Sequence, residues 1–222
     1  NKAIIVVDGS FLPDSGISTA AWVLAGPDGP VQGLGYCRLP GGNEDNDPYR
    51  AELFGLCLAL GVLQVLHAIS PNLKGRITIS CDNDQSLCHG ITHERWPKVQ
   101  APHYDILSLL HGMRAKVPFD LLPTQVAGHQ DSKSTGPLSR LETLNIIADD
   151  AARTLAHKIE RAQDTQSDLS TPKYNWRITL NNKVLKKNIR QRIREKVLGD
   201  RLVHHWVERG KLQPDAIANM DW

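Results

Sequence analysis

Short β-branched runs alternate along the chain with longer stretches that have helical spacing. Residues 2–7 form a continuous apolar run that stops at Asp8, Gly9 and Ser10, which predicts a buried strand followed by a turn. Residues 19–25 and 31–38 are also strand-like, and a segment rich in Gly and Pro separates them. The front of the chain is therefore predicted to be an antiparallel meander of three strands, with Asp8 at the carboxyl end of the first.

Helical periodicity begins after this meander. Leucines recur every three or four positions through residues 49–69, which predicts a long apolar helix. A short strand is predicted at residues 76–81, directly before Asp82. Residues 84–91 can begin a second helix with Asp82 or Asn83 as its cap. A second aspartate is therefore expected at the carboxyl end of a strand.

The same alternation continues toward residue 162. A helix is predicted over residues 103–116, and residues 119–126 fit a last strand, although Pro123 interrupts it. Apolar residues then follow one helical face from residue 141 to residue 159. This order of elements predicts an α/β domain with a mixed sheet.

The remaining residues are predicted to form a separate region. Residues 163–173 are polar and rich in turn formers, residues 176–185 fit a small hairpin around Asn181 and Asn182, and residues 188–208 fit a basic amphipathic helix. We therefore divide the chain into a core, 1–162, and a connecting region, 163–222. The basic helix is either a phosphate-binding arm or a helix that packs toward a following domain, and the second reading is favoured.

Composition narrows the class of protein. The chain has 222 residues, of which 41% are hydrophobic, enough for one domain with an appendage. No apolar run approaches the length of a membrane helix, and no secretion signal is recognised, so an intracellular, cytoplasmic or nuclear protein is expected. Because the sequence starts at Asn1 without Met, we expect a segment of a polyprotein. The four cysteines lack paired ligand spacing and are expected to be small buried hydrophobes rather than a zinc site.

The net charge of +2 conceals an asymmetry. Residues 1–150 carry 11 basic and 16 acidic side chains, whereas residues 151–222 carry 15 basic and 8 acidic ones. An acidic front and a basic back are consistent with metal-binding carboxylates beside a surface that attracts phosphate. A solvated basic helix would explain the same numbers, and composition does not separate the two readings.

Four acids occupy positions where the predicted elements could bring them together: Asp8, Glu52, Asp82 and Asp149. Each has an ordinary explanation when taken alone, as a turn residue, an acid at a helix start, an N-cap or a solvated helix residue. Taken together, carboxylates this close repel one another and imply a bound cation. All-oxygen ligands favour Mg²⁺ or Mn²⁺ over zinc. Asp150 points about 100° away from Asp149 around the helix and is expected at the surface.

At this point the sequence resembles the ribonuclease H family. The resemblance covers roughly residues 1–160 and depends on the joint order of several weak motifs. These motifs are Val6-Val7-Asp8-Gly9-Ser10, Arg50-Ala51-Glu52-Leu53, the strand-end Asp82, Val126-Ala127-Gly128-His129, and Asn145-x-x-Ala148-Asp149-x-Ala151. It implies a three-layer fold in which a five-stranded mixed sheet is flanked by helices.

The resemblance also implies an activity, hydrolysis of the RNA strand of an RNA/DNA hybrid to give 5′-phosphate and 3′-hydroxyl ends. Asp8, Glu52, Asp82 and Asp149 would ligate two Mg²⁺ ions, one activating water and the other stabilising the departing oxygen, and Mn²⁺ would be an alternative ion. His129 would move protons or help release product. Selectivity would come from contacts to RNA 2′-hydroxyl groups. Candidates for backbone or sugar contacts are Ser10, Asn83 and Gln85.

Three departures from the family pattern bear on the prediction. The stretch from His129 to Asn145 is longer than in compact cellular members, and Asp84 is an alternative ligand to Asp82. The basic, Trp-rich helical insertion of those members is not recognised. A reduced version of it would consist of His93, Arg95, Trp96 and Lys98. Lack of the insertion resembles retroviral and retroelement domains, so a covalently linked reverse transcriptase is the expected partner.

Two rival functions remain open. A strand transferase of the transposase or integrase type can share the fold, but such enzymes generally use three acids, and the Glu52 position and the His129 loop argue against it. A domain that only binds nucleic acid or spaces its neighbours is the other rival. The complete set of carboxylates argues against that second possibility without establishing turnover.

Overall fold

The computed structural model describes residues 2–40, 45–98, 100–128 and 136–162, together with 179–180, 183–184, 196 and 209. The chain divides into two compact units, residues 1–173 and 174–222. In the second unit, Thr179–Leu180 (β6) and Lys183–Val184 (β7) pair antiparallel, where the hairpin was predicted. The predicted helix at 188–208 lies almost entirely outside the described residues. The proposed boundary near residue 162 stays a prediction.

The first unit is built on a five-stranded mixed sheet with strand order β3-β2-β1-β4-β5. β1, β2 and β3 are antiparallel neighbours, whereas β4 lies parallel to both β1 and β5. This confirms the predicted α/β class and the mixed sheet. The strands are β1 (Lys2–Leu12), β2 (Ile17–Ala25), β3 (Val31–Arg38), β4 (Arg76–Cys81) and β5 (Asp120–Gln125).

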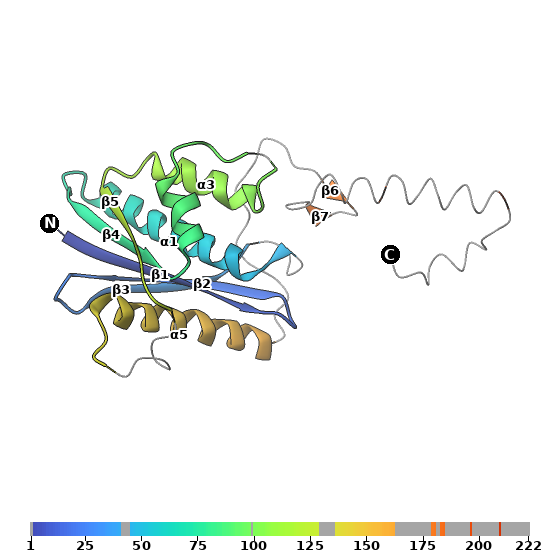
Figure 1. The fold of residues 1–222 in the computed structure, drawn as a ribbon, viewed down its shortest axis with the longest axis horizontal. Coiled ribbons are helices and arrows are strands. Elements are labelled where there is room, and N and C mark those ends of the chain that lie inside the picture. Colours follow the sequence, from blue (N-terminus) through green and yellow to red (C-terminus); the bar gives the residue numbers. More distant parts are fainter. Residues whose placement is uncertain are drawn as a thin grey trace. The chain divides into compact units, whose positions relative to one another are not determined.

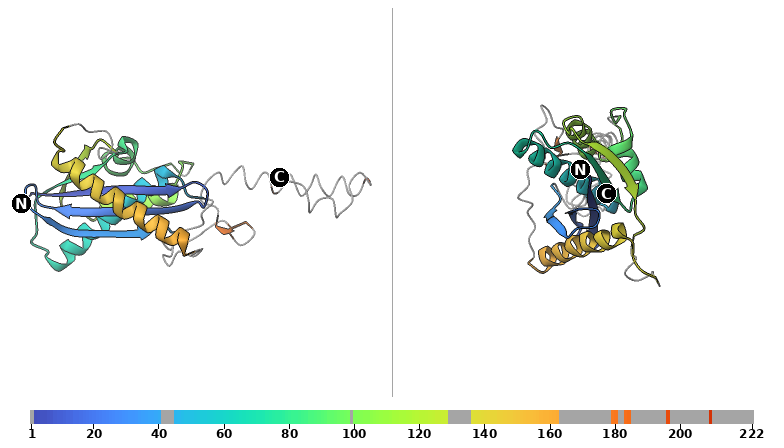
Figure 2. Two further views of the ribbon diagram at one scale, coloured as in Figure 1. Left: turned by 90° about the horizontal axis from the view of Figure 1, so that it is seen from below. Right: turned by 90° about the vertical axis from the view of Figure 1, so that its left-hand side faces the viewer.

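Helices cover both faces of the sheet, as Figures 1 and 2 show. Ile5 and Val7 of β1 pack in the core on the side of α1 and α3, and Val6 between them packs against α5. This alternation follows from the two-residue period of a strand, and it explains why the run is apolar at every position. The helical elements are α1 (Pro48–Ile69), α2 (Asp84–Leu87), the π-helical turn η2 (Cys88–Thr92), α3 (Tyr104–Arg114) and α5 (Arg140–Arg161).

α1 begins at a well-formed cap. The Asp47 carboxylate accepts a hydrogen bond from the backbone N–H of Arg50 at 2.8 Å, and Pro48 stands at the start of the helix, where its missing N–H is not needed. Contrary to the expectation from continuous apolar runs, α1 meets the length and composition of a membrane-spanning helix. Half of that apolar window is buried inside the fold, as in a core helix. The cap fixes where the helix starts and so places the residues of its first turn.

β1 is longer than predicted. β1 continues to Leu12 instead of stopping before Asp8, because its pairing with β2 runs on to Leu12 and Ile17, beyond the predicted turn. Its parallel pairing with β4 ends at Val6 and Ser80. Asp8 therefore lies within β1, but immediately past the point where β4 stops, and the predicted turn at Asp8 is wrong.

β5 tolerates Pro123 because it is an edge strand, where a missing N–H need not break a ladder. The predicted helix at 84–91 is divided into α2 and the wider, π-helical turn η2, which extends to Thr92. Asn83 is the N-cap of α2, and its side chain accepts a hydrogen bond from the backbone N–H of Ser86 at 3.0 Å. Asp82 and Asn83 were both predicted as possible caps, and the structure has Asn83 in this role.

α5 is anchored at its start and near its middle. Ser139 and Glu142 form a capping box at its N-terminus. Further along, the Thr19 hydroxyl of β2 donates to the backbone carbonyl of Ala152 at 2.7 Å, in a fully buried contact. These two attachments fix how α5 lies across β1 and β2.

Candidate active site

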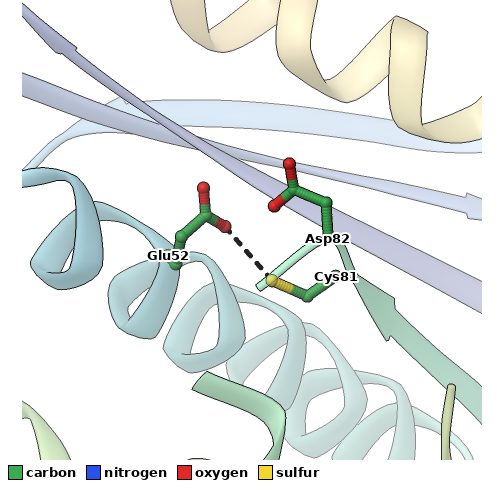
Figure 3. Close-up of side chains that lie close together, drawn as sticks. All are labelled: Glu52, Cys81 and Asp82. Carbon is green, nitrogen blue, oxygen red and sulfur yellow. Dashed lines mark hydrogen bonds between the residues drawn. The ribbon is translucent and has the colours of Figure 1, made fainter. Parts of the chain in front are cut away.

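Acidic side chains from three separate elements meet where β4 ends. Glu52 is the fifth residue of α1, and Asp82 directly follows β4. Figure 3 shows their carboxylates and the Cys81 thiol directed toward a common point. One ligand atom from each of these three residues lies within 4.8 Å of the others. Asp8 of β1 completes the group through its electrostatic interactions with Glu52 and Asp82. The structure therefore brings together three of the four predicted metal ligands.

Gly9 makes this meeting possible. A Cβ added at Gly9 would lie 2.6 Å from the backbone carbon of Ala51, so only glycine lets β1 and the start of α1 approach this closely. The Gly9 N–H donates to Oε1 of Glu52 at 3.1 Å. The close contact between strand and helix thus sets the position of the Glu52 carboxylate, which is only 7% exposed.

The buried carboxyls strongly disfavour ionisation. Burial, followed by the charge of Asp82, raises the pKa of Asp8 from 3.8 to about 7. Burial and the charges of Asp8 and Asp82 likewise raise the pKa of Glu52 well above its ordinary value. Hydrogen bonds from Gly9 oppose both shifts but do not cancel them. A bound cation would reverse this balance by stabilising the ionised forms.

Cys81 is a member of the site that the sequence did not indicate. Its thiol donates to Oε2 of Glu52 at 3.2 Å, and its sulfur accepts from the backbone N–H of Asn83 at 3.4 Å. Burial is the main cause that raises the pKa of this thiol. Cys81 lies in the hydrophobic core as expected of a small buried residue, but the expectation did not include its hydrogen bond to Glu52. The one available indication was its place beside a strand-end aspartate.

α5 reaches the site through Asn145. The Asn145 amide donates to Oδ2 of Asp8 at 3.2 Å, and the side chain is 2% exposed. Asp149 lies one helical turn further along α5, on the same face, and pairs with Arg153. Its side chain is 16% exposed, whereas Asp150 lies at the surface as expected. Asp149 is thus held on the helix face that contacts Asp8, and its role as a ligand stays a prediction.

The loop after β5 also approaches the site. A Cβ added at Gly128 would overlap the Asp82 carboxylate, so the backbone there lies against this acid. The Gln125 side chain donates to the backbone carbonyl of Asp82 at 3.1 Å. Both contacts connect the end of β5 to the end of β4, and in the sequence Gly128 stands out only as part of the motif Val126-Ala127-Gly128-His129. His129, the next residue, lies outside the described residues.

The remaining predicted residues occupy different surroundings. Ser10 is half-buried in β1 and pairs with Thr19 of β2. Asn83 is engaged as the cap of α2, while Gln85 is exposed on that helix. Asp84 is exposed as well, and the metal-ligand group contains Asp82 instead. The geometry therefore favours Asp82 over Asp84 as the ligand.

A charge-paired cluster lies on the other side of the first turn of α1. Arg50 is completely buried and donates to both carboxylate oxygens of Asp105 at 2.9 and 2.6 Å. His103 lies 3.4 Å from the same guanidinium through Nδ1 and 2.9 Å from Asp47 through Nε2. These contacts tie the N-cap of α1 to α3. They hold the turn that carries Glu52.

The donor set fits a hard divalent cation. Carboxylate oxygens are the ligands that Mg²⁺ and Mn²⁺ prefer, and three carboxylates meet here, two of them buried (Asp8 and Glu52) and one half-buried (Asp82). Asn145 Oδ1 is buried and has no hydrogen-bond partner among the residues that the structure describes. An unsatisfied buried oxygen beside ionisable acids is the environment that a cation with its water would complete.

Comparisons with known proteins agree on the fold. No family model matches the chain, and no curated protein matches its sequence. Among solved structures, LC11-RNase H1, isolated from compost by a metagenomic approach, is 17% identical with a TM-score of 0.53, covering 72% of this chain and 99% of that one. The PFV RNase H domain is also 17% identical, with a TM-score of 0.51, covering 70% and 94%. These likenesses, together with the mixed sheet between α1, α3 and α5, show that the first unit of this chain has the ribonuclease H fold.

Proposed function

We propose that this chain is a metal-dependent endoribonuclease of the ribonuclease H family that hydrolyses the RNA strand of RNA/DNA hybrids. The observation that carries the proposal is the meeting of the buried Glu52 and the half-buried Asp82, from α1 and the end of β4, with the buried Asp8 of β1, which interacts electrostatically with both. Ligands of open α/β sheets collect beyond the carboxyl ends of the strands, where this group lies. The resemblance of the motifs in the sequence supports the same assignment.

Asp8, Glu52 and Asp82 would hold the metal, with Asp149 as the fourth ligand. Two Mg²⁺ ions, when bound, would supply activation of a water molecule and charge stabilisation at the leaving 3′ oxygen. The chain's own contribution is to hold these acids in place. Gly9 N–H and the Cys81 thiol each bind one oxygen of Glu52, and the Asn145 amide binds Asp8. Both carboxylates are thereby held before substrate arrives.

The substrate contacts proposed from the resemblance differ in how freely they can act. Gln85 is exposed next to the site and is the more accessible candidate for a sugar or phosphate contact. The side-chain oxygen of Asn83 already caps α2, which leaves its amide group for such a contact. Ser10 lies two residues beyond Asp8 on β1. Selectivity for a hybrid would come from contacts of this kind to RNA 2′-hydroxyls.

The biological setting is a separate part of the proposal. The sequence resembles the domains that accompany retroelement reverse transcriptases, and removal of template RNA after first-strand synthesis is the corresponding role. The test is a comparison of the chain alone with the chain supplied with a reverse transcriptase. Faster or more processive cleavage of the hybrid when the reverse transcriptase is present supports this setting, and identical cleavage with and without it counts against it.

A labelled-substrate assay tests the activity. The purified chain is incubated with RNA/DNA hybrid, single-stranded RNA and double-stranded DNA, each with Mg²⁺, Mn²⁺ or EDTA, and Asp8→Asn is assayed in parallel. We expect metal-dependent cleavage of the RNA strand of the hybrid only, leaving 5′-phosphate ends, and no cleavage by the variant. Asp150→Asn is the matched control, because this neighbouring acid is exposed and should be neutral.

Other outcomes identify the rivals. Cutting or joining of DNA would indicate a strand transferase on the same fold. Binding of hybrid without cleavage under any metal condition would indicate a nucleic-acid-binding or spacer domain. Either result overturns the proposed function.

A further inference from the structure

One donor in the site does not suit magnesium. Cys81 is fully buried, and its sulfur lies 3.2 Å from Oε2 of Glu52. Mg²⁺ binds hard oxygen ligands, whereas Zn²⁺, Co²⁺ and Cd²⁺ bind thiolate sulfur with much greater preference. Glu52, Cys81 and Asp82, which we term the thiol-carboxylate triad, therefore combine ligands for a softer metal with ligands for a hard one.

The spacing of the triad fits a tetrahedral ion. Zinc bonds of about 2.3 Å to sulfur and about 2.0–2.2 Å to oxygen place the sulfur and an oxygen roughly 3.5 Å apart. The observed separation between Cys81 Sγ and Glu52 Oε2 is 3.2 Å, and all three ligand atoms of the triad lie within 4.8 Å of one another. Small side-chain rotations would bring them to bonding distance of one ion.

A second observation also points to a cation. Asn145 is 2% exposed, its Nδ2 lies 3.2 Å from Oδ2 of Asp8, and its Oδ1 has no hydrogen-bond partner among the described residues. A buried amide oxygen that lacks a partner is unfavourable by about 1–3 kcal/mol. A cation or its bound water beside Asp8 would satisfy this oxygen. The amide thus adds a neutral oxygen donor at the edge of the acidic group.

We infer that Glu52, Cys81 and Asp82 form a binding site for one thiophilic divalent cation, represented by Zn²⁺, and that its occupancy excludes the hard metal needed for cleavage. On binding, a sulfur–metal bond forms, the thiol proton passes to solvent, and the hydrogen bond from the thiol to Glu52 is replaced by shared coordination. The Asn83 N–H, 3.4 Å from the sulfur, would stabilise the thiolate in that complex. The inhibitory consequence rests on the proposed function, whereas the binding does not.

Cobalt provides the direct test, because Co²⁺ substitutes for Zn²⁺ and absorbs light through thiolate-to-metal charge transfer. The whole chain is freed of metal with EDTA, exchanged into chelator-free buffer and titrated with Co²⁺. We expect a charge-transfer band that saturates at one cobalt per chain and is lost in Cys81→Ser. Glu52→Gln keeps the size of the side chain but removes its charge, and it should weaken cobalt binding at least tenfold.

Two matched cysteine variants make the assignment specific. Cys37→Ser removes a half-buried thiol on β3, away from the triad. Cys88→Ser removes the thiol that lies 3.9 Å from Nδ1 of His93, the rival pair for a soft metal. Both variants should keep the band. A band lost in Cys88→Ser and kept in Cys81→Ser would overturn the inference, and so would wild-type protein that shows no band.

Folding and function are separated by two more measurements. Circular dichroism and thermal melting establish that Cys81→Ser is folded, and Cys81→Ala serves as a second variant if it is not. In hybrid cleavage at saturating Mg²⁺, each protein is compared with its own rate without zinc. Wild type should be half-inhibited at a zinc concentration at least tenfold lower than Cys81→Ser. Equal zinc sensitivity contradicts the exclusion of Mg²⁺. If no hybrid is cleaved at all, the proposed function fails while the cobalt spectrum still decides the metal site.

Discussion

The start of α1 has two opposite electrostatic sides. Arg50 and Glu52 are two residues apart and both are buried, but Arg50 faces the carboxylate of Asp105 in a two-point ion pair. Glu52 faces the carboxyls of Asp8 and Asp82, and both acids raise its pKa. One helical turn therefore contributes to a paired cluster and to a cluster of like charges.

The two sides of α1 are expected to have different roles, one in stability and the other in catalysis. A buried ion pair with matched partners is internally satisfied and holds elements together. Like charges held together in a buried setting oppose folding unless protons or a cation neutralise them. The Arg50 side of α1 is thus expected to determine stability, and the Glu52 side is expected to determine metal binding and activity.

Glu52→Gln should give the largest effect and should affect activity only. The amide preserves the size of the side chain but removes a ligand charge, so the rate of hybrid cleavage should fall at least about 1000-fold, roughly 4 kcal/mol in activation free energy. The unfolding free energy without metal should stay equal or rise. Initial rates together with urea denaturation check both halves. A variant that keeps its activity would remove Glu52 from the proposed site.

Arg50→Met should have the opposite profile. It leaves the Asp105 carboxylate without its buried partner, and breaking such a pair costs about 3–5 kcal/mol of stability. Urea denaturation measures the loss. The double variant Arg50→Met with Asp105→Leu should recover part of it, because the unpaired charge is gone. A stability unchanged by the single substitution would contradict the structural role of this pair.

Magnesium should stabilise the protein only through the acidic side. A ligand that binds the folded state at 100 times its dissociation constant adds about 2.7 kcal/mol to the unfolding free energy. Thermal melting with Mg²⁺ against EDTA should show this gain for wild type. Asp8→Asn should lose most of the gain, whereas Asp150→Asn should keep it. Equal gains in wild type and Asp8→Asn would exclude Asp8 as a ligand.

The smallest expected effect is on the pH dependence of stability in EDTA. Asp8 has a pKa of about 7 in the folded protein against an ordinary 3.8, so the folded state binds more protons and its stability falls as pH rises through this window. Asp8→Asn lacks this loss. Its stability relative to wild type should increase from about pH 4 to pH 7 and then level off. Urea denaturation across this range measures the gap, and a constant gap would contradict the prediction.

Much of the fold could be predicted because periodicity and turn residues are local properties. The predicted bounds of β3 and β4 agree with the structure, and α1 differs by one residue at its start. β1 was predicted too short because Asp8, Gly9 and Ser10 have the composition of a turn. Their pairing with β2 is a tertiary interaction that overrides this local preference.

The site was predictable only in part for the same reason. Strand ends are visible in a sequence, so Asp8 and Asp82 could both be assigned to the ends of strands, and the resemblance of the motifs suggested that they meet. The contribution of Cys81 could not be seen, because it depends on Glu52 arriving from α1 at a distance set by Gly9. Likewise, the pairing of Arg50 with Asp105 joins residues 55 positions apart, and no local pattern reveals it.

The buried hydroxyl of Thr19 holds α5 in position along its helix axis. By binding the carbonyl of Ala152, it sets where along its own length the helix crosses the sheet. Sliding by a single turn would carry every α5 side chain about 5.4 Å past β1. The distance between Asp149 and the other acids is therefore governed by a neutral hydrogen bond on β2 that takes no part in the chemistry. Valine is similar in shape to threonine but cannot donate this hydrogen bond. Thr19→Val should therefore make the position of α5 along the sheet less well defined, although every acid of the site is still present.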